Sequence, residues 1–573
     1  MSLLSLLSHW QSDGSIAENI AAWQILPPRQ AQMEPIPGDL HPFLKTALLE
    51  RGISSLYTHQ AEAWRVAQSS EHVAVVTGTA SGKTLCFNLP VLDHLLSNSQ
   101  GRALYLYPTK ALAQDQLSVV HDLLTTFHKA LPDKGILQSS APGTVKPGIY
   151  DGDTPTSQRQ SIRNNARLII TNPDMLHTGI LPHHTVWSEF FRNLRYVVID
   201  EMHTYRGVFG SHFANVLRRL RRITAFYNAH PQFILTSATI ANPQQLAEKL
   251  VEEPVHIIDQ DGSRRGEKHF LVYNPPVVDR ELGIRKSLTQ ECVRLATDLV
   301  TSDVQTILFG RTRRTIEVIL RYLKTESGDN NSEIIRGYRS GYLAAHRREI
   351  EQGLRSGKVR AVVATSALEL GVDIGQMEAA VLAGYPGTIA STWQQAGRAG
   401  RGEVPALSVL VTSANPLDQF LAHHPEYFFK RAPEQALINP DNPLILLGHL
   451  RCAAFELPFQ KTTEGALFGN LPPELVQQYL DFLQQQGVLH QSAGRYFWMS
   501  DQYPAQGISL RSAGGENVVL QTCTEGRSQT IGIVDLPSAT WFTHPGAVYL
   551  HEGVSYIVES LDLENHLAQL SPL

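Results

Sequence analysis

Residues 77–84 read Thr-Gly-Thr-Ala-Ser-Gly-Lys-Thr, and they follow a short apolar run and precede helical text. A strand, a glycine-rich loop and a helix form the usual phosphate cradle, because Gly78 and Gly82 let the backbone approach an anion and the helix N-terminus offers free N–H groups. Lys83 is expected to reach the β- and γ-phosphates of ATP, and the Thr84 hydroxyl is expected to lie on Mg²⁺. The alternative is a plain turn with a surface lysine.

A pair of acidic residues follows another predicted buried strand, further along the chain. Asp200 and Glu201 come directly after the apolar run Tyr196–Ile199, so they lie at the end of a buried strand. In the sheet that carries the phosphate loop, Asp200 is expected to hold Mg²⁺ through water, and Glu201 to orient and deprotonate the attacking water. The alternative is a pair of acids that cap a helix.

Residues 394–401 read Gln-Gln-Ala-Gly-Arg-Ala-Gly-Arg, between two predicted buried strands. Arginine presents a fixed fork to phosphate oxygens, so Arg398 and Arg401 suit the charge that develops on a transferred phosphoryl group. An ordinary basic turn is the alternative. We therefore predict a catalytic set for ATP hydrolysis composed of Lys83, Asp200, Glu201, Arg398 and Arg401.

The bulk composition fits a protein of several domains. The chain has 573 residues, 42% of them hydrophobic and 18% charged, and a net charge of −5, so any nucleic-acid contact must come from a local groove. Its four cysteines are scattered without a CxxC pair, which excludes a zinc site and favours a reducing compartment. The first ten residues read as an amphipathic helix rather than a signal peptide, and no apolar run is long enough for a membrane span.

The pattern of apolar runs divides the chain. Continuous apolar runs alternate with helical text in two blocks, which predicts two α/β domains with parallel sheets. The predicted strands lie at 72–77, 102–107, 167–171, 195–199 and 232–236 in the first block, and at 305–309, 360–364, 379–383 and 407–411 in the second. A helical segment at 472–486 and a tight hairpin at 487–498 indicate a winged helix. We predict an N-terminal accessory arm (1–55), a first α/β domain (56–260), a second α/β domain (270–430), the winged helix (435–503) and a small β-rich domain (504–573).

At this point the chain resembles a superfamily 2 helicase of the DEAD/DEAH-box type, over about residues 56–415. The resemblance implies two tandem RecA-like domains. The motifs that carry it stand in order at 57–60, 77–84, 107–112, 171–174, 200–203, 237–239, 364–373 and 394–401.

The resemblance also implies roles for single residues. Gln60 would read the adenine edge, and Gly371 and Asp373 would face the nucleotide. The nucleotide set is then Gln60, Gly78, Thr79, Ala80, Ser81, Gly82, Lys83, Thr84, Gly371 and Asp373. The set that couples hydrolysis to domain movement is His203, Ser237, Thr239 and Gln394. The set on the phosphates of one nucleic-acid strand is Thr109, Lys110, Thr171, Asn172, Arg311 and Thr365.

In a narrower sense, the chain resembles the MrfA (YprA-like) DNA-repair helicases, on the segments 56–64, 79–84, 439–443 and 544–551. It implies 3′→5′ movement on DNA and a repair role. Such proteins carry a C-terminal zinc module with four clustered cysteines. This chain stops soon after residues 560–563, so we expect a truncated or short form without zinc, with ATP and Mg²⁺ as its cofactors.

We therefore expect an ATP hydrolase that acts as a 3′→5′ DNA helicase on single-stranded or tailed duplex DNA, bound through its backbone. We also expect a monomer in the bacterial cytoplasm, associated with the nucleoid, with a repair nuclease as a possible partner and no membrane. An RNA helicase, a duplex translocase or clamp without unwinding, and a protein translocase are the alternatives. The basic cluster at 218–222 and the rings of Trp393 and Trp498 are further candidates for nucleic-acid contact, against a solvated face and core packing.

Overall fold

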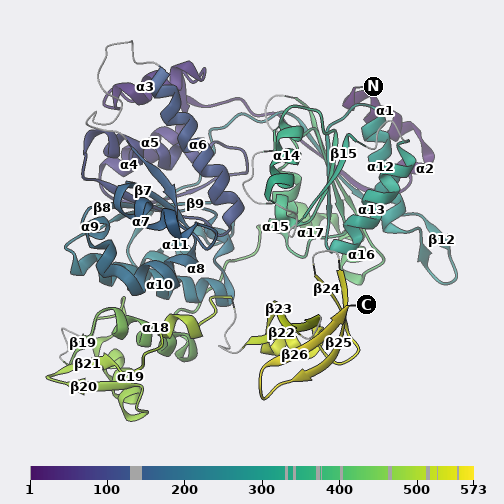
Figure 1. Ribbon diagram of the computed structural model, residues 1–573. Helices are drawn as coiled ribbons and strands as arrows, with labels where there is room; N and C mark the ends of the chain where they lie inside the picture. The colour runs from purple at the N-terminus through teal and green to yellow at the C-terminus, as the bar shows by residue number, and fades with distance from the viewer. Residues whose placement is uncertain are drawn as a thin grey trace.

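The computed structural model describes residues 2–129, 145–328, 333–339, 344–369, 374–375, 377–400, 404–461, 467–511, 517–524, 527–551 and 554–572. Two α/β domains lie side by side, and a winged helix and a β-rich domain lie below them in the view of Figure 1. This architecture confirms the predicted fold class. Among the described residues, no helix is both long and apolar enough to cross a membrane.

The first RecA-like domain is built on a sheet of seven parallel strands in the order β10-β4-β9-β8-β5-β7-β6. The predicted strands at 72–77, 102–107, 167–171, 195–199 and 232–236 are all found. The strands are β4 (His72–Val76), β5 (Arg102–Leu106), β6 (Pro147–Ile149), β7 (Leu168–Thr171), β8 (Leu194–Ile199), β9 (Gln232–Ser237) and β10 (Val255–Ile258). The main helices are α3 (Pro42–Glu50), α4 (Thr58–Gln68), α5 (Lys83–Ser97), α6 (Lys110–Lys129), α7 (Thr156–Asn165), α8 (Pro173–Met175), α9 (Ser188–Arg192), α10 (Gly207–Phe226) and α11 (Pro243–Val251).

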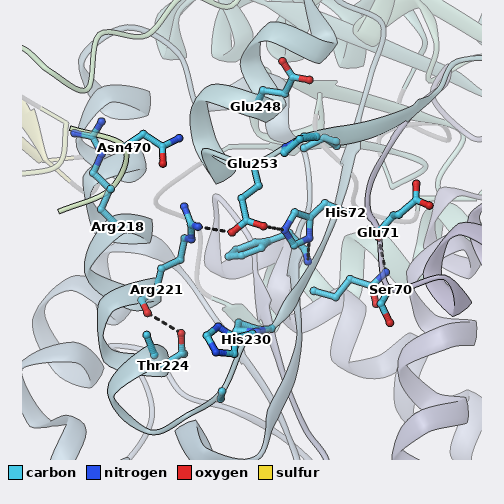
Figure 2. Close-up of a pocket in the computed structure, with 18 of the residues that line it drawn as sticks. Ser70, Glu71, His72, Arg218, Arg221, Thr224, His230, Glu248, Glu253 and Asn470 are labelled. Carbon is cyan, nitrogen blue, oxygen red and sulfur yellow. Dashed lines mark hydrogen bonds and ion pairs between the residues drawn. The ribbon is translucent and has the colours of Figure 1, made fainter. Parts of the chain in front are cut away.

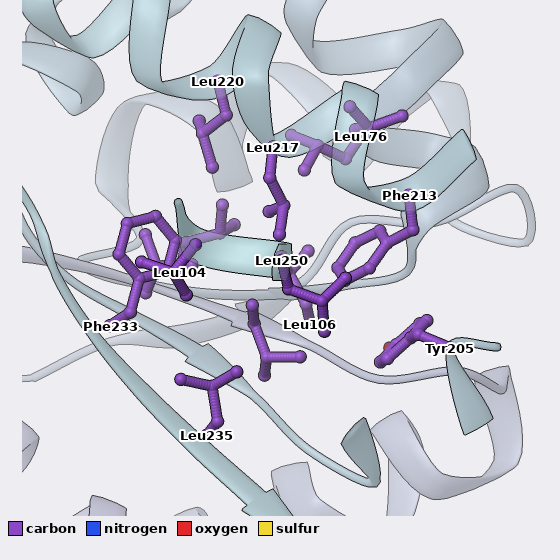
Figure 3. Packing of buried hydrophobic residues seen from close by; sticks show 14 of the residues in the cluster. Leu104, Leu106, Leu176, Tyr205, Phe213, Leu217, Leu220, Phe233, Leu235 and Leu250 are labelled. Atoms are coloured by element: carbon purple, nitrogen blue, oxygen red, sulfur yellow. The ribbon is translucent and has the colours of Figure 1, made fainter. Parts of the chain in front are cut away.

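Helix α10 closes one face of this sheet. Its residues Phe213 and Leu217 are four apart, so they share one side of the helix and reach the same cluster as Leu104 and Leu235 of the sheet. Figure 3 shows these side chains meeting between helix and sheet. Since both faces of the strands are covered, the strands are apolar throughout, which is why their runs are visible in the sequence.

The second RecA-like domain also has a seven-stranded sheet, in the order β1-β11-β18-β17-β14-β16-β15, and only β1 runs antiparallel to its neighbour among these described strands. The strands are β1 (Ile20–Leu26), β11 (Lys268–Tyr273), β14 (Thr306–Gly310), β15 (Ile335–Tyr338), β16 (Ala361–Ala364), β17 (Ala379–Ala383) and β18 (Ala406–Val411). The helices around it are α12 (Leu288–Thr301), α13 (Arg313–Glu326), α14 (Ala344–Arg355), α15 (Ile389–Ala396), α16 (Pro416–His423) and α17 (Pro425–Lys430).

The N-terminal arm is divided between the two domains. Helix α1 (Leu3–Ser12) packs on the second domain, where the indole of Trp10 donates to Asp298 at 3.0 Å, and β1 joins that sheet. The chain then crosses to the first domain, where β2 (Met33–Pro35) pairs with β3 (Ser55–Tyr57). The chain therefore crosses between the domains once before the first domain and once after it.

Two smaller domains complete the chain. The winged helix contains α18 (Pro443–Glu456), α19 (Pro473–Gln485), β19 (Phe459–Gln460) and the predicted hairpin β20 (Leu489–Ser492) and β21 (Arg495–Trp498). The last domain has a five-stranded sheet in the order β23-β22-β26-β25-β24. Its elements are β22 (Asn517–Thr524), β23 (Arg527–Asp535), α20 (Leu536–Phe542), β24 (Val548–His551), β25 (Val554–Asp562) and β26 (Leu567–Pro572).

Candidate nucleotide site and strand track

The phosphate loop connects β4 to α5, as predicted. Ala80 and Gly82 adopt left-handed φ angles of 64° and 79°, which turn the loop back on itself. The Lys83 amine donates to the carbonyls of Thr77 at 2.9 Å and Gly78 at 2.6 Å, so it lies folded over the loop. Helix α5 begins without a side-chain cap, which leaves its first N–H groups for an anion.

The acidic pair lies at the carboxyl end of β8, two strands from the loop. Asp200 Oδ1 accepts the backbone N–H of Glu201 at 2.8 Å and the hydroxyl of Thr236. Burial and the adjacent Glu201 carboxylate raise the pKa of Asp200 to about 7. A buried carboxylate with a raised pKa is a site that gains from a bound cation, so the donor set fits Mg²⁺.

Three of the five predicted catalytic side chains interact across the domain boundary. Burial raises the pKa of Glu201, whereas the charges of Lys83 and Arg398 lower it. Arg398 is buried and donates from Nη2 to the carbonyl of Glu369 at 2.9 Å. The positive charges of Lys83 and Arg398 therefore both act on the Glu201 carboxylate. Arg401, Gly371 and Asp373 lie outside the described residues.

A buried histidine bridges the two domains. His203 Nδ1 accepts the backbone N–H of Ala238 at 3.2 Å and lies 3.4 Å from the Ser237 hydroxyl. Burial lowers the pKa of His203 to about 3, so the ring is neutral. The carboxamide of Gln394, from the second domain, lies 2.5 Å from Nε2. Three of the four predicted coupling residues thus form one chain of contacts, while Thr239 has an exposed side chain.

The second domain also touches the phosphate loop itself. A Cβ added to Gly397 would lie 2.1 Å from the Thr79 hydroxyl oxygen and 2.9 Å from the carbonyl of Trp393. Only glycine allows this approach, because any side chain would overlap the loop. The arginine motif of the second domain therefore packs on the phosphate loop at Gly397, as the two motifs would if they shared a nucleotide.

The residues before the loop hold it from the other side. Gln60 accepts the N–H of Tyr57 at 2.9 Å and donates to the carbonyl of Gly82 at 3.0 Å. Both polar groups of the Gln60 carboxamide are thus engaged with backbone around the loop. Its predicted contact with the adenine edge remains a proposal.

The residues predicted for the strand divide into two groups. Thr109, Lys110 and Arg311 are exposed, and Lys110 pairs with the exposed carboxylate of Asp153 at 2.7 Å. Arg311 lines a cavity of about 460 Å³ between the domains, next to His203 and Gln394. Thr365 is half-buried, and its hydroxyl accepts the N–H of Ala367 at 3.3 Å.

Thr171 and Asn172 direct their side chains to backbone of their own domain, and their predicted contact with strand phosphates stays a prediction. The Thr171 side chain is fully buried, and its hydroxyl donates to the carbonyl of Tyr150 at 2.5 Å. Asn172 accepts the N–H of Met175 at 2.8 Å and so caps α8. Each side chain satisfies backbone of its own domain, because strand β7 ends there and a short helix begins.

The basic cluster at 218–222 has a structural role. Arg218 pairs with Glu252 at 2.7 Å, Arg221 pairs with Glu253, and Arg222 donates to the carbonyl of Ala453 at 2.8 Å. Together with the buried Arg219, which contacts Glu456, they fix α10 to its surroundings, including the winged helix. Arg218, Arg221 and Arg222 also line a cavity of about 1150 Å³. Figure 2 shows the side chain of Arg221 beside Glu253, which in turn contacts His72.

This cavity lies at the amino end of β4, whereas the phosphate loop follows its carboxyl end. The cluster is therefore on the edge of the sheet opposite the nucleotide site. The Trp393 ring stacks on Phe428 with centroids 5.0 Å apart, so it is also a packing residue.

Sequence reasoning missed two contributors to these sites. Thr236 supports Asp200, and its position directly before the motif at 237–239 is a signal that could have found it. Arg511 reaches the carbonyl of Pro108, which precedes the strand residues Thr109 and Lys110. No motif surrounds Arg511, so the sequence offered no signal for it.

The fold and the site define a two-domain motor ATPase of the helicase type. Known families agree with this class. Residues 57–246 match the family described as "DEAD/DEAH box helicase", residues 288–403 the "Helicase conserved C-terminal domain", and residues 438–513 "ATP-dependent helicase HRQ1, winged helix domain". The chain is 49% identical to the "Uncharacterized ATP-dependent helicase YprA" of Bacillus subtilis, over 96% of this chain and 71% of that protein.

Other relatives extend the comparison. The chain is 34% identical to the "ATP-dependent helicase HRQ1" of Saccharomyces cerevisiae over 90% of this chain and 47% of that protein, so it spans about half the length of this relative. The crystal structure of the "DUF1998 helicase MrfA bound to DNA and AMPPNP" superimposes with a TM-score of 0.85 and 47% identity, over 100% of this chain and 77% of that one. The chain belongs to the DEAD/DEAH-box helicases of the YprA and MrfA family, with an HRQ1-type winged helix, and it is an ATP-dependent helicase.

Proposed function

We propose that this chain is a DNA helicase that moves 3′→5′ along one strand and serves DNA repair. The contact between His203 and Gln394 carries the ATP-driven part of the proposal, because it joins the acidic motif of one domain to the arginine motif of the other. Two solved structures of the relative MrfA, both described as bound to DNA, support DNA as the substrate. Polarity and the repair role rest on the resemblance to that family.

The chain's residues take distinct parts in this reaction. Lys83 and the N-terminus of α5 would hold the phosphates, and Thr84 and Asp200 would hold Mg²⁺. Magnesium, when bound, neutralises charge on the phosphate oxygens. Glu201 orients the attacking water and takes its proton, and its raised pKa makes it a stronger base than a solvated carboxylate.

Domain movement follows from the same contacts. Arg398 and Gln394 belong to the second domain, so their interactions with Glu201 and His203 are made only when the domains are closed. A ligand that favours the closed state shifts the domains toward it by its difference in affinity for the two states. Closure on ATP and release after hydrolysis would then advance the domains along a strand.

Strand displacement tests the proposal. The substrates are DNA and RNA duplexes with either a 3′ or a 5′ single-stranded tail, with ATP and Mg²⁺ present. We expect displacement of the DNA duplex with the 3′ tail alone. Displacement of RNA but not DNA would indicate an RNA helicase, and strand-stimulated hydrolysis without displacement would indicate a translocase or clamp.

The matched variants are Lys83→Ala and Lys249→Ala. Lys249 is an exposed lysine on α11 of the same domain, so its loss changes the charge equally without touching the loop. We expect Lys83→Ala to abolish strand-stimulated hydrolysis and Lys249→Ala to retain it. Retained turnover in Lys83→Ala would contradict the assignment of the nucleotide site.

A further inference from the structure

Arg511 lies in the segment that joins the winged helix to the β-rich domain, and this segment is anchored on the first RecA-like domain. Its neighbour Leu510 is buried in the main core cluster of that domain, with Ala436 and Ile438. Ala505, in the short helix η7 (Pro504–Gly507), is buried as well. Because Leu510 is fixed in this core, the backbone of the next residue, Arg511, is held in a defined place.

The guanidinium of Arg511 is held against the domain surface. It stacks over the ring of Phe209 at 4.3 Å from the centroid, which orients its plane. Nη2 lies 3.5 Å from Asp174 Oδ2 and 3.4 Å from the carbonyl of Pro108. The side chains of Arg511 and Asp174 are 56% and 52% exposed, so solvent reaches both partners of this long ion pair.

These contacts are at one edge of the sheet. Leu106 of β5 and Thr171 of β7 are paired neighbours at the carboxyl ends of their strands, so the loops that follow them emerge together. The first loop leads into α6, which begins at Lys110, and the second leads into the short helix α8, which contains Asp174. This edge therefore holds two exposed cations, Lys110 and Arg511, and each is paired with an exposed carboxylate.

We propose that Arg511 binds a backbone phosphate of the nucleic-acid strand, beside Lys110, and that Asp174 takes the place of that phosphate when no strand is bound. Arginine presents five donors in a fixed fork, and an exposed carboxylate at 3.5 Å is a weak partner that a phosphate displaces. The inference rests on the proposed function, because it assumes that a strand crosses this edge.

The charge change predicts a salt dependence. Each phosphate contact on a single strand contributes about −0.7 to the slope of log affinity against log salt, irrespective of sequence. Arg511→Gln should therefore bind more weakly than the wild type, with a slope shallower by about 0.7. Between about 50 and 200 mM salt, the ratio of wild-type to variant affinity should shrink about 2.6-fold.

The experiment is a fluorescence anisotropy titration of the full chain with a labelled single-stranded deoxythymidine oligonucleotide at several salt concentrations. Arg192→Gln is the matched control, because Arg192 is an exposed arginine at the end of α9, which precedes the amino end of β8 and so lies at the opposite edge of the sheet. Arg511→Lys keeps the positive charge, so it should keep most of the salt slope of the wild type. If Arg511 acted only through the packing of its guanidinium, the lysine variant would behave like Arg511→Gln instead.

Asp174→Asn should change the affinity for the strand in the opposite direction. It removes the competing carboxylate, so it should tighten binding at low salt, and this gain should vanish in the double variant with Arg511→Gln. If the wild type binds the strand and Arg511→Gln keeps both the affinity and the slope of Arg192→Gln, the assignment of Arg511 is wrong. If the wild type itself binds no strand and no strand stimulates its ATP hydrolysis, the proposed function fails instead.

Discussion

The buried ion pair between Arg219 and Glu456 should decide whether the winged helix stays docked. Arg219 belongs to α10 of the first domain, and Glu456 ends α18 of the winged helix. Their side chains are 0% and 1% exposed, and Arg219 Nε lies 3.1 Å from both carboxylate oxygens. Arg219 Nη1 also donates to His177 at 2.6 Å, and burial followed by the Arg219 charge lowers the pKa of that ring, which therefore stays neutral.

The variant Arg219→Met leaves Glu456 buried without a counter-charge. Removing one partner of a buried pair costs about 3–5 kcal/mol, which corresponds to between about two and four powers of ten in the ratio of docked to undocked winged helix. The double variant Arg219→Met with Glu456→Leu removes both charges, so it should recover most of the loss. Arg221→Met is the matched control on the same helix, because its pair with Glu253 is partly exposed and should contribute less than about 1 kcal/mol.

Hydrogen exchange of the amides in α18, with α5 as an internal reference, measures this equilibrium. We expect exchange in α18 to accelerate by at least about 100-fold in Arg219→Met while exchange in α5 is unchanged. The reasoning is refuted if Arg219→Met exchanges like Arg221→Met, or if the double variant is no better than the single one.

The remaining predictions concern the closed site. Gly397→Ala should lower strand-stimulated turnover roughly 5- to 150-fold, because its methyl overlaps the Thr79 hydroxyl, and a second change, Thr79→Ala, should restore part of the rate in a steady-state ATPase assay. Asp200 binds its proton more tightly in the folded state than unfolded, so the nucleotide-free protein should lose stability as pH rises from about 4 to about 7; Asp200→Asn should reduce this loss in melting curves, and an unchanged pH dependence would contradict it. Gln394→Ala should retain basal hydrolysis but lose stimulation by a strand, since it breaks the bridge to His203, and stimulation equal to the wild type would exclude that coupling.

The sequence predicted local structure better than contacts between distant segments. The predicted strand at 379–383 matches β17 because a strand buried on both faces leaves a continuous apolar run. The edge strand β1 was missed, since its partner Phe270 lies almost half the chain away from Gln24 and nothing local encodes that pairing. Pairing at an edge depends on where the second domain folds, which no window of residues contains.

The candidate site divides in the same way. The phosphate loop and the acidic pair each follow a buried strand. Their position at the carboxyl ends of the strands could therefore be inferred from the order of strands and loops in the sequence. The arginines at 218–222 were ambiguous, because their partners Glu252 and Glu456 are distant in sequence and the burial of the cluster is invisible without them. Thr171 shows what a motif leaves open. The motif gives the residue type at this position, but the direction of the hydroxyl depends on the backbone carbonyl of Tyr150, which no motif includes.

The two chain crossings give the motor its hinge. The N-terminal crossing and the linker at 259–267 run side by side, where Arg29 and Arg265 exchange backbone hydrogen bonds at 2.8 and 2.9 Å, and Arg29 pairs with Asp261 at 2.8 Å. His59 ties this pair of crossings to the nucleotide site, since its ring accepts the N–H of Gly262 at 3.2 Å and donates to the carbonyl of Ser81 at 3.0 Å. A paired crossing resists twisting more than a single chain does, so we expect the two domains to move mainly by bending at these crossings. The Ser81 carbonyl that His59 contacts belongs to the same loop as Thr79, so a bend at the crossings would change the close approach of Thr79 to Gly397.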